Sequence, residues 1–269
     1  MKKYLIGIDL DGTLLTSKET INKESESYLK ALQRDGHKLV LATGRPLRAC
    51  QNYYQQLDLT TPLICDNGSS IYQMNDPHFK TLVKTIAHQD LKSIFRFCKE
   101  FLVMGFYNVG DYFYSYQTEN FSFPFFHITP STKVIKGDLD NPNYLEPVLI
   151  MLAIDSHYKK EFENYLAAFK TLNARFWGEK DNIALFEVYQ NNFNKGNALL
   201  TIAHHLNHPQ NKIITFGDGA NDFELLAVAN HGVCMINGRE ELKKTTKNIT
   251  NHNNDNNGVI NYLKTFFAT

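Results

Sequence analysis

The chain has 269 residues, of which 43% are hydrophobic and 21% are charged, as is typical of a globular protein. This length exceeds what one compact core usually takes, so we expect about two domains. Lysine plus arginine equals aspartate plus glutamate at 28 each, so the formal net charge is zero. The chain as a whole therefore lacks the basic footprint of a nucleic-acid-binding protein.

The cysteines and the apolar runs indicate the compartment. The four cysteines, at 50, 65, 98 and 234, form no CxxC pair, which argues against a zinc site or a disulfide framework and for a reducing compartment. The first apolar run ends at Asp9, too soon for a signal peptide. The longest later run, at 148–154, is far too short to span a bilayer. We therefore expect a cytoplasmic protein with no membrane attachment.

In the first part of the chain, buried strands alternate with helices. Short apolar runs bounded by turn residues predict strands at 3–8, 37–45 and 61–73. Apolar stripes predict helices at 21–36 and 46–59, the first ending at Gly36 and the second with Pro46 in its first turn. This alternation predicts a parallel sheet with crossover helices.

The pattern changes between about residues 82 and 190. The sequence "NVGD" predicts the turn of a hairpin within an aromatic-rich stretch at 106–126, and we expect this stretch to be core and not a ligand site. The remaining elements expected here are helices at 91–101 and 157–170, a strand at 146–154 and two strands within 174–190. Such a mixture of hairpins and helices predicts a separate α+β unit.

From residue 195 the first pattern resumes. We expect helices at 196–206, 221–229 and 259–267, and strands at 212–218 and 231–236. The predicted fold class is therefore α/β, with a Rossmann-like parallel-sheet core domain and an inserted α+β cap domain. The predicted boundaries are 1–81 and 191–269 for the core domain and 82–190 for the cap.

Four polar clusters follow four of the predicted strands. They are "DLDGT" from Asp9, "TGR" from Thr43, "DNG" from Asp66 and "GDGAND" from Gly217, and Lys195 comes after the insert at the start of a helix. Each has an ordinary explanation when taken alone: a turn, a helix cap or a solvated lysine. Ligands, however, bind beyond the carboxyl ends of parallel strands, so we expect the clusters to meet at one edge of the sheet.

The residue types at that edge suit phosphoryl transfer. Carboxylates are hard oxygen ligands for Mg²⁺, and a cation would offset the repulsion between Asp9 and Asp11. Thr43, Lys195 and the turn amides after Asp9 supply donors for a phosphate. Phosphoryl transfer needs mainly positioning and charge neutralisation, and a carboxylate nucleophile can divide it into two steps.

These motifs resemble those of the haloacid dehalogenase superfamily of phosphotransferases. The resemblance is closest to its Cof-type sugar-phosphatase branch, in which a large α/β (type IIB) cap is inserted. It covers nearly the whole chain and depends on the segments "DLDGTLL", "LATGR", "DNGSSIY", "NKGNAL", "GDGANDFELL" and "NNDNNGV". Two departures stand out: Asn194 where serine is common before the lysine, and "MINGRE" at 235–240 in place of an "MGNA"-like stretch.

The resemblance implies a role for each site residue. Asp9 would be the nucleophile that becomes an aspartyl-phosphate, and Asp11 the general acid and then the general base. Mg²⁺ would be bound by Asp9, Asp218 and the carbonyl of Asp11, with Asp222 either supporting the metal indirectly or joining it. The phosphoryl group would be held by the amide of Leu10 together with Thr43, Gly44, Lys195 and Asn221.

We therefore expect an enzyme, a Mg²⁺-dependent phosphatase of small phosphorylated metabolites such as a sugar phosphate or a nucleotide-like compound. It should act as a monomer or homodimer, without nucleic acid or membrane partners. One alternative is a phosphomutase of similar architecture, which normally needs several basic cap residues, whereas this cap is rich in aromatics and amides. The other is a phosphometabolite-binding protein that has lost turnover, although every motif residue is present.

Overall fold

The computed structural model describes residues 3–76, 79–119, 121 and 127–268. It divides into two compact units, of which the first comprises Met1–Gly44, Cys50–Leu82 and Asn194–Thr269. The second comprises Arg45–Ala49 and Val83–Phe193. Most of the second unit is one continuous segment, and this segment interrupts the first unit along the chain.

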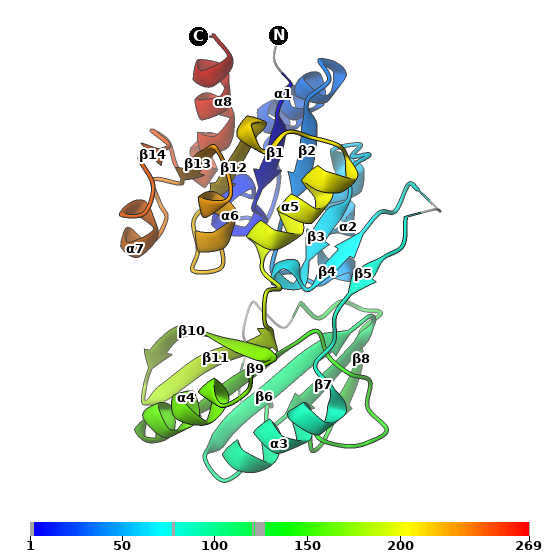
Figure 1. Ribbon diagram of the computed structural model, residues 1–269, viewed down its shortest axis with the longest axis vertical. Helices are drawn as coiled ribbons and strands as arrows, with labels where there is room; N and C mark the ends of the chain where they lie inside the picture. The colour runs from blue at the N-terminus through cyan, green and yellow to red at the C-terminus, as the bar shows by residue number, and fades with distance from the viewer. Residues whose placement is uncertain (1–2, 77–78, 120, 122–126, 269) are drawn as a thin grey trace. The chain divides into compact units, whose positions relative to one another are not determined.

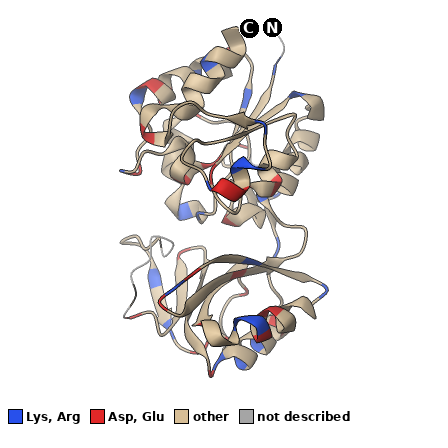
Figure 2. Ribbon diagram, turned by 90° about the vertical axis from the view of Figure 1, so that its left-hand side faces the viewer, with Lys and Arg blue, Asp and Glu red and all other residues tan. Residues whose placement is uncertain are grey.

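A five-stranded parallel sheet forms the centre of the first unit, in the order β14-β13-β12-β1-β2 (Figure 1). Four of its five strands contain no Lys, Arg, Asp or Glu and are drawn tan in Figure 2, and β1, β12 and β13 among them are mostly buried, as expected for parallel strands covered on both faces. The strand bounds are β1 Leu5–Ile8, β2 Lys38–Leu41, β12 Ile213–Gly217, β13 His231–Cys234 and β14 Asn248–Ile249. The predicted parallel sheet is confirmed, and β14 is an edge strand that the sequence did not predict.

Helices cover both faces of this sheet (Figure 1). On one face lie α5 (Lys195–His205) and α6 (Phe223–Ala227), which contact each other, and on the other lie α1 (Lys23–Arg34) and α8 (Gly258–Ala268). A short helix, α7, follows at Glu240–Lys243. The buried cluster on the α5 face includes Leu5, Val40, Leu199, Ile202, Ile213 and Leu225. Gly36, with φ +89°, follows the end of α1 as predicted.

The region around the predicted second helix differs from expectation. Instead of one helix from Pro46, a 3-10 turn at Leu47–Ala49 precedes a shorter helix, α2, at Gln51–Gln56. Cys50 lies between the two with φ −135°, outside the helical range, and its buried Sγ is 3.4 Å from that of Cys65. The non-helical backbone of Cys50 thus separates the 3-10 turn from α2. All four cysteines are free and buried.

The predicted third strand is shorter than expected and returns on itself. It becomes β3 (Leu63–Cys65), a turn at Asp66–Gly68 and an antiparallel partner, β4 (Ser70–Tyr72), followed by β5 (Leu82–Val83). A parallel bridge between Ala42 and Ile64 places β3 beside the end of β2. The carboxyl end of β3 therefore lies next to that of β2.

The second unit is built on a six-stranded sheet in the order β10-β11-β9-β6-β7-β8. Its strands are β6 Leu102–Val109, β7 Tyr112–Tyr116, β8 Lys133–Lys136, β9 Leu149–Asp155, β10 Leu172–Lys180 and β11 Ile183–Gln190. Every pair is antiparallel except β7 with β8, so the sheet is mixed. Helices α3 (His88–Cys98) and α4 (Lys159–Ala167) pack on one face through a shared hydrophobic core.

The elements predicted for this α+β unit are confirmed, with one addition. Gly110 forms the predicted hairpin turn between β6 and β7 with φ +56°. The added strand is β8, a mostly exposed edge strand of sequence KVIK, which lacks the apolar run that marks a buried strand.

The aromatic stretch is core where the structure describes it. Phe106, Tyr107, Phe113 and Tyr114 are all buried, and the rings of Tyr107 and Tyr114 stack with centroids 4.8 Å apart. Residues 120 and 122–126 of this stretch lie outside the described residues.

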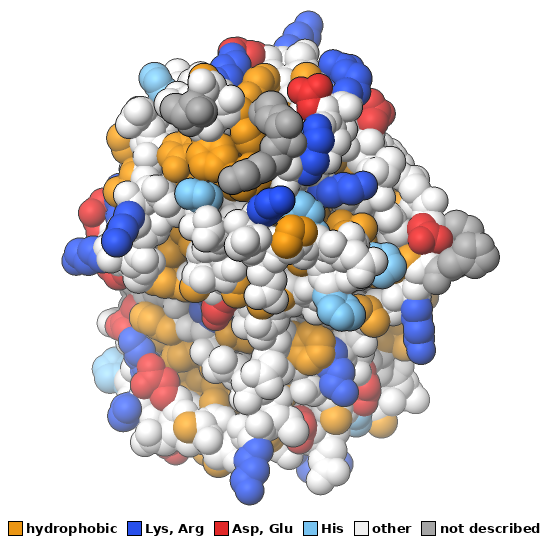
Figure 3. Space-filling model, turned by 45° about the horizontal axis from the view of Figure 1, so that its top comes forward, with side chains coloured by type: hydrophobic (Ala, Val, Ile, Leu, Met, Phe, Trp, Pro, Cys, Tyr) orange, Lys and Arg blue, Asp and Glu red, His pale blue; other side chains and the backbone are white. Residues whose placement is uncertain are grey.

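The surface reflects the balance of charge. On the face drawn in Figure 3, acidic and basic side chains are interspersed among hydrophobic and neutral ones. Among the described residues, no helix combines the length and apolar character needed to cross a bilayer.

The contact between α5 and α6 gives a test of the fold. A Cβ added at Gly196 would lie 2.3 Å from the carbonyl oxygen of Glu224, so Gly196→Ala must push the two helices apart. We expect a loss of about 1–3 kcal/mol in the free energy of unfolding, as for other overpacked sites, measured by urea denaturation. Asn197→Ala, at the exposed neighbouring position, is the control and should change the stability by less than about 0.5 kcal/mol. Equal stabilities of the two variants would contradict this close approach.

Candidate active site

The strand register brings the predicted polar clusters to one edge of the first unit. Ile8, the last residue of β1, lies opposite Leu41 of β2 and Phe216 of β12. The next residues continue the register, since the amide of Asp9 donates to the carbonyl of Phe216 at 3.1 Å. Asp9, Thr43 and Asp218 therefore all come within two residues of strand ends that stop level with one another.

A tight turn follows Asp9. The amides of Leu14 and Leu15 donate to the carbonyls of Asp9 and Leu10 at 3.2 and 2.8 Å, which closes the chain over Leu10–Leu14. Gly12 has φ +72°, and a Cβ there would lie 2.4 Å from Oδ2 of Asp218. Glycine is thus required both by the backbone conformation and by the closeness of the carboxylate.

Lys195 is the centre of a buried charge cluster. Its side chain is fully buried, and its Nζ donates to Oδ1 of Asp9 at 2.6 Å and to Oδ1 of Asp222 at 2.7 Å. One carboxylate oxygen from each of Asp9, Asp218 and Asp222 lies within 4.8 Å of the others. The surface-lysine explanation of Lys195 is therefore wrong, and Asp9, which is buried, does not belong to an ordinary solvated turn.

Asp222 links two parts of the cluster. While Oδ1 accepts from Lys195, Oδ2 accepts from the backbone amides of Asp218 and Gly219 at 3.0 and 2.9 Å. Both oxygens of Asp222 thus already have donors. Thr13 holds another member of the cluster, because its Oγ1 donates to Oδ1 of Asp218 at 3.0 Å. Thr13 was missed as a site residue, although it belongs to the "DLDGT" motif.

Burial and mutual charge shift the pKa values of the cluster. Burial, and then the charge of Asp222, raise the pKa of Asp218 to about 7. Burial also raises the pKa of Asp9 well above its usual range, although Lys195 acts in the opposite direction. For Lys195, burial would lower the pKa, but Asp222 and Asp9 outweigh it and raise the pKa above its usual value. The cluster therefore holds more negative charge than one lysine offsets.

A second loop carries the remaining contacts. Asp66, Asn67 and Gly68 all have positive φ, a conformation that these residue types tolerate best. A Cβ on Gly68 would lie 2.3 Å from the backbone of Asn194, so this glycine lets the start of α5 approach the loop. Asn194, in place of the family's serine, still caps the helix by accepting from the amide of Asn197.

Asn67 connects the two loops that flank β1. Its Oδ1 accepts from Nδ2 of Asn221 at 2.8 Å, and a Cβ on Gly44 would lie 2.8 Å from the same oxygen. Asn67 was not singled out from the sequence, although the "DNG" motif was. The structure thus brings the predicted phosphate-binding residues Gly44 and Asn221 to a common neighbour.

The other predicted site residues lie on the same loops. Thr43 is buried, with its amide donating to Ile64 and its carbonyl accepting from Asn67. Leu10 is buried at the start of the turn, while Asp11 is exposed on it. Their catalytic and binding roles remain predictions.

The fold and the cluster together define a class of protein. Clustered aspartates and a buried lysine at the strand ends of a parallel α/β core suit phosphoryl transfer, which depends on positioning and on charge neutralisation. The chain matches the model of the haloacid dehalogenase-like hydrolase family over residues 6–263 and belongs to that family. The predicted superfamily is thereby confirmed.

Known proteins of similar sequence match over nearly their whole length. The 5-amino-6-(5-phospho-D-ribitylamino)uracil phosphatase YitU of Bacillus subtilis is 31% identical over 275 residues, covering 99% of this chain and 98% of the relative. Phosphatase YwpJ of the same organism is 27% identical over 302 residues, covering 97% and 98%.

Solved structures agree on the fold. The subclass IIB sugar phosphatase BT4131 superposes with a TM-score of 0.80 at 22% identity, covering 99% of this chain and all of the other. A haloacid dehalogenase-like hydrolase from Bacteroides thetaiotaomicron gives 0.79 at 22% identity. The predicted α/β core with an inserted cap is confirmed.

The cluster also fits a divalent cation. Asp9, Asp218 and Asp222 supply closely spaced carboxylate oxygens, the donors that hard cations prefer. Burial raises the pKa values of Asp9 and Asp218, so a further positive charge would favour the ionised form of both. The site therefore has the donor set and the charge of a divalent metal site.

Removing Lys195 tests this balance. Lys195→Met leaves buried carboxylates without their counter-charge, which should cost about 3–5 kcal/mol of stability at pH 7 in the presence of EDTA. Urea denaturation measures the loss, and Asp222→Asn in the same chain should restore part of it. Lys244→Met, at an exposed lysine, is the control. Identical unfolding midpoints for Lys195→Met and the wild type would show that the cluster does not depend on this charge.

Proposed function

We propose that this chain is a Mg²⁺-dependent phosphatase that hydrolyses small phosphorylated metabolites through an aspartyl-phosphate. The observation that supports this most strongly is the fully buried Lys195 between Asp9 and Asp222, beside Asp218, at the strand ends of a haloacid dehalogenase-like hydrolase. A buried charge cluster of this kind stabilises the fold poorly and suits a site where phosphate charge develops.

Asp9 acts first in this mechanism. One of its carboxylate oxygens attacks phosphorus, the bond from phosphorus to the leaving oxygen breaks, and Asp11 gives that oxygen a proton. Water then attacks the phosphorus of the aspartyl-phosphate while Asp11 takes its proton, which releases inorganic phosphate and restores Asp9. The exposure of Asp11 beside the buried Asp9 suits a group that exchanges protons with substrate and water.

The remaining residues hold charge in place. Lys195, Thr43, Gly44, Asn221 and the amide of Leu10 would bind the phosphoryl oxygens. Asp9, Asp218 and the carbonyl of Asp11 would hold Mg²⁺, which when bound neutralises phosphate charge. Because the two oxygens of Asp222 together accept three hydrogen bonds, we assign it mainly to holding the loop and Lys195, so that it would support the metal indirectly.

We place the core domain at 1–81 and 191–269 and the cap at 82–190. The buried free thiols suit a reducing compartment, which supports a cytoplasmic location for a monomer or homodimer. The substrate would be a sugar phosphate or nucleotide-like compound. The uracil ribityl phosphate named for the 31% identical relative combines both features and belongs first in a substrate panel.

The nucleophile is tested with p-nitrophenyl phosphate. Asp9→Asn removes the attacking carboxylate, so the Mg²⁺-dependent kcat should fall by about 10³-fold or more. Release of p-nitrophenol with and without Mg²⁺ measures this. Asp35→Asn, at an exposed aspartate, is the matched control and should keep the wild-type rate. Equal Mg²⁺-dependent rates for Asp9→Asn and the wild type would refute the assignment.

The metal site predicts a pH dependence of Mg²⁺ binding. Asp218, with its pKa raised to about 7, is protonated in metal-free protein at lower pH, and a proton competes with the cation. The affinity for Mg²⁺ should therefore rise between pH 6 and pH 8, by up to about tenfold per pH unit for each of the ligands Asp218 and Asp9 that must lose a proton. Isothermal titration of metal-free protein measures it. The same affinity at both pH values would exclude Asp218 as a ligand that must lose a proton.

A further inference from the structure

We propose that Asn237, together with the segment Asn253–Asn257, forms a clamp that fixes the turn carrying Asp11. Asn237 would then be a positioning residue for the phosphatase reaction. This inference rests on the proposed function. It gives a role to two stretches that the mechanism leaves unused, "MINGRE" and the asparagine-rich "NNDNNG".

Asn237 contacts the turn directly. Its Nδ2 donates to the carbonyl oxygen of Gly12 at 2.7 Å. Gly12 has φ +72° and no side chain, so its backbone is intrinsically the most mobile point between Asp11 and Thr13. A hydrogen bond to its carbonyl fixes the orientation of the peptide that follows. Asp11 precedes Gly12 on this exposed turn, so fixing the turn limits where its carboxylate can lie.

The loop that carries Asn237 is attached to the aspartate loop after β12. The amide of Met235 donates to the carbonyl of Gly217 and that of Arg239 to the carbonyl of Asp218, both at 3.0 Å. Asn237 lies midway between these two attachments. Asn237 therefore links the turn that carries Asp11 to the loop that carries Asp218. In the proposed reaction these two parts must keep a fixed separation.

Asn254 holds Asn237 in place by a hydrogen bond. The amide of Asn254 donates to Oδ1 of Asn237 at 3.2 Å, and its own Nδ2 donates to the carbonyl of Leu15 at 2.9 Å. The turn is thus held at both ends, at Gly12 and at Leu15, through one pair of asparagines. A side-chain amide donates and accepts at once, which suits it to link two backbone segments.

The same segment continues to hold the chain after the turn. Oδ1 of Asp255 accepts from the amide of Ser17 at 2.8 Å. Oδ1 of Asn257 accepts from Nδ2 of Asn22 at 2.8 Å and from Oγ of Ser25 at 3.0 Å. Asn257 itself has φ +56°, and a Cβ on the next residue, Gly258, would lie 2.2 Å from the carbonyl of His252. The segment is therefore tightly folded and fixed in position.

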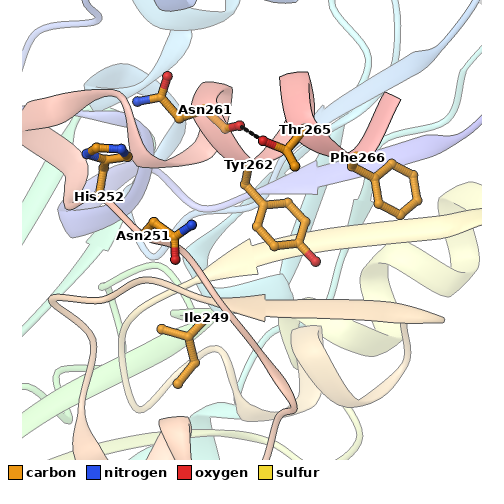
Figure 4. Close-up of a pocket in the computed structure, with 7 residues that line it drawn as sticks. All are labelled: Ile249, Asn251, His252, Asn261, Tyr262, Thr265 and Phe266. Carbon is orange, nitrogen blue, oxygen red and sulfur yellow. Dashed lines mark hydrogen bonds between the residues drawn. The ribbon is translucent and has the colours of Figure 1, made fainter. Parts of the chain in front are cut away.

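Two isosteric substitutions separate positioning from folding. Asn237→Asp keeps the acceptor for Asn254 and removes the donor to Gly12, and Asn254→Asp removes the donor to Leu15. Asn237→Ala removes the same donor without adding charge. The control is Asn251→Asp, in the same polar stretch but lining a pocket beside α8 with Tyr262 and Thr265 (Figure 4). Because Asn237 is exposed, its loss should leave the melting temperature almost unchanged.

For these three variants we expect kcat for p-nitrophenyl phosphate to fall by about 10- to 100-fold and KM to fall with it, so that kcat/KM, which reports the first step, changes little. A misplaced Asp11 slows the attack of water more than the departure of p-nitrophenolate, which is a good leaving group. Rapid-mixing experiments should therefore show a burst of about one p-nitrophenol per enzyme, which a merely destabilised protein would not give.

The outcomes are separable from those of the proposed function. If the wild type has no Mg²⁺-dependent turnover, the phosphatase proposal itself fails. If the wild type is active and Asn237→Asp and Asn237→Ala retain its kcat, the clamp is refuted. It is refuted also if Asn251→Asp loses as much activity as they do, or if their loss follows a fall in melting temperature without a burst. Should Asn237→Asp fail to fold, Asn254→Asp decides by the same readouts.

Discussion

The active end of this molecule depends on one ion-pair cluster, in which a fully buried lysine amine lies between two carboxylates. Lys195 begins α5, where the positive end of the helix dipole disfavours a cation, and its charge there is stabilised by Asp9 and Asp222. Removing either charge type leaves the other buried and uncompensated. The glycines at 12, 68 and 196 then follow as requirements, because each lets backbone come close enough to complete the cluster.

The parallel sheet is what brings these charges together. Parallel strands in register end at the same level, so residues far apart in sequence, such as Asp9, Thr43 and Asp218, become neighbours without any long loop. Because β1 and β12 contain no charged residue, the charges lie in the loops that follow these strands, at that edge of the sheet. A site on rigid strand ends is also precise, which phosphoryl transfer needs more than it needs chemically unusual groups.

The clamp and the buried charge cluster hold different parts of the site in position. Buried charge fixes Asp9, Asp218 and Asp222, whereas Asp11 lies on an exposed turn whose backbone the clamp holds. Uncharged amides suit that second task, because they bind carbonyl oxygens without adding to the excess of negative charge nearby. In this view a polar tail segment that resembles an ordinary loop is part of the catalytic framework.

The sequence by itself determined the alternation of elements, the parallel core, the inserted α+β unit and the aspartates, threonine and lysine of the site. These features are carried by local periodicity and by motifs at strand ends, which a single sequence displays directly. The edge strands β8 and β14 escaped prediction, because exposed or two-residue strands carry no hydrophobic pattern. The break at Cys50 also escaped, since its buried contact with Cys65 joins residues that are 15 apart and leaves no local pattern.

Only the tertiary structure decided which polar residues meet. Lys195 could be assigned as buried, and not solvated, only once its distances to Asp9 and Asp222 were known. Asn67, Thr13 and Asn237 likewise gained their importance from hydrogen bonds spanning 154, 205 and 225 residues of sequence. Such contacts produce no periodic pattern in the sequence, because the same amide or hydroxyl residue can face water or a distant backbone carbonyl.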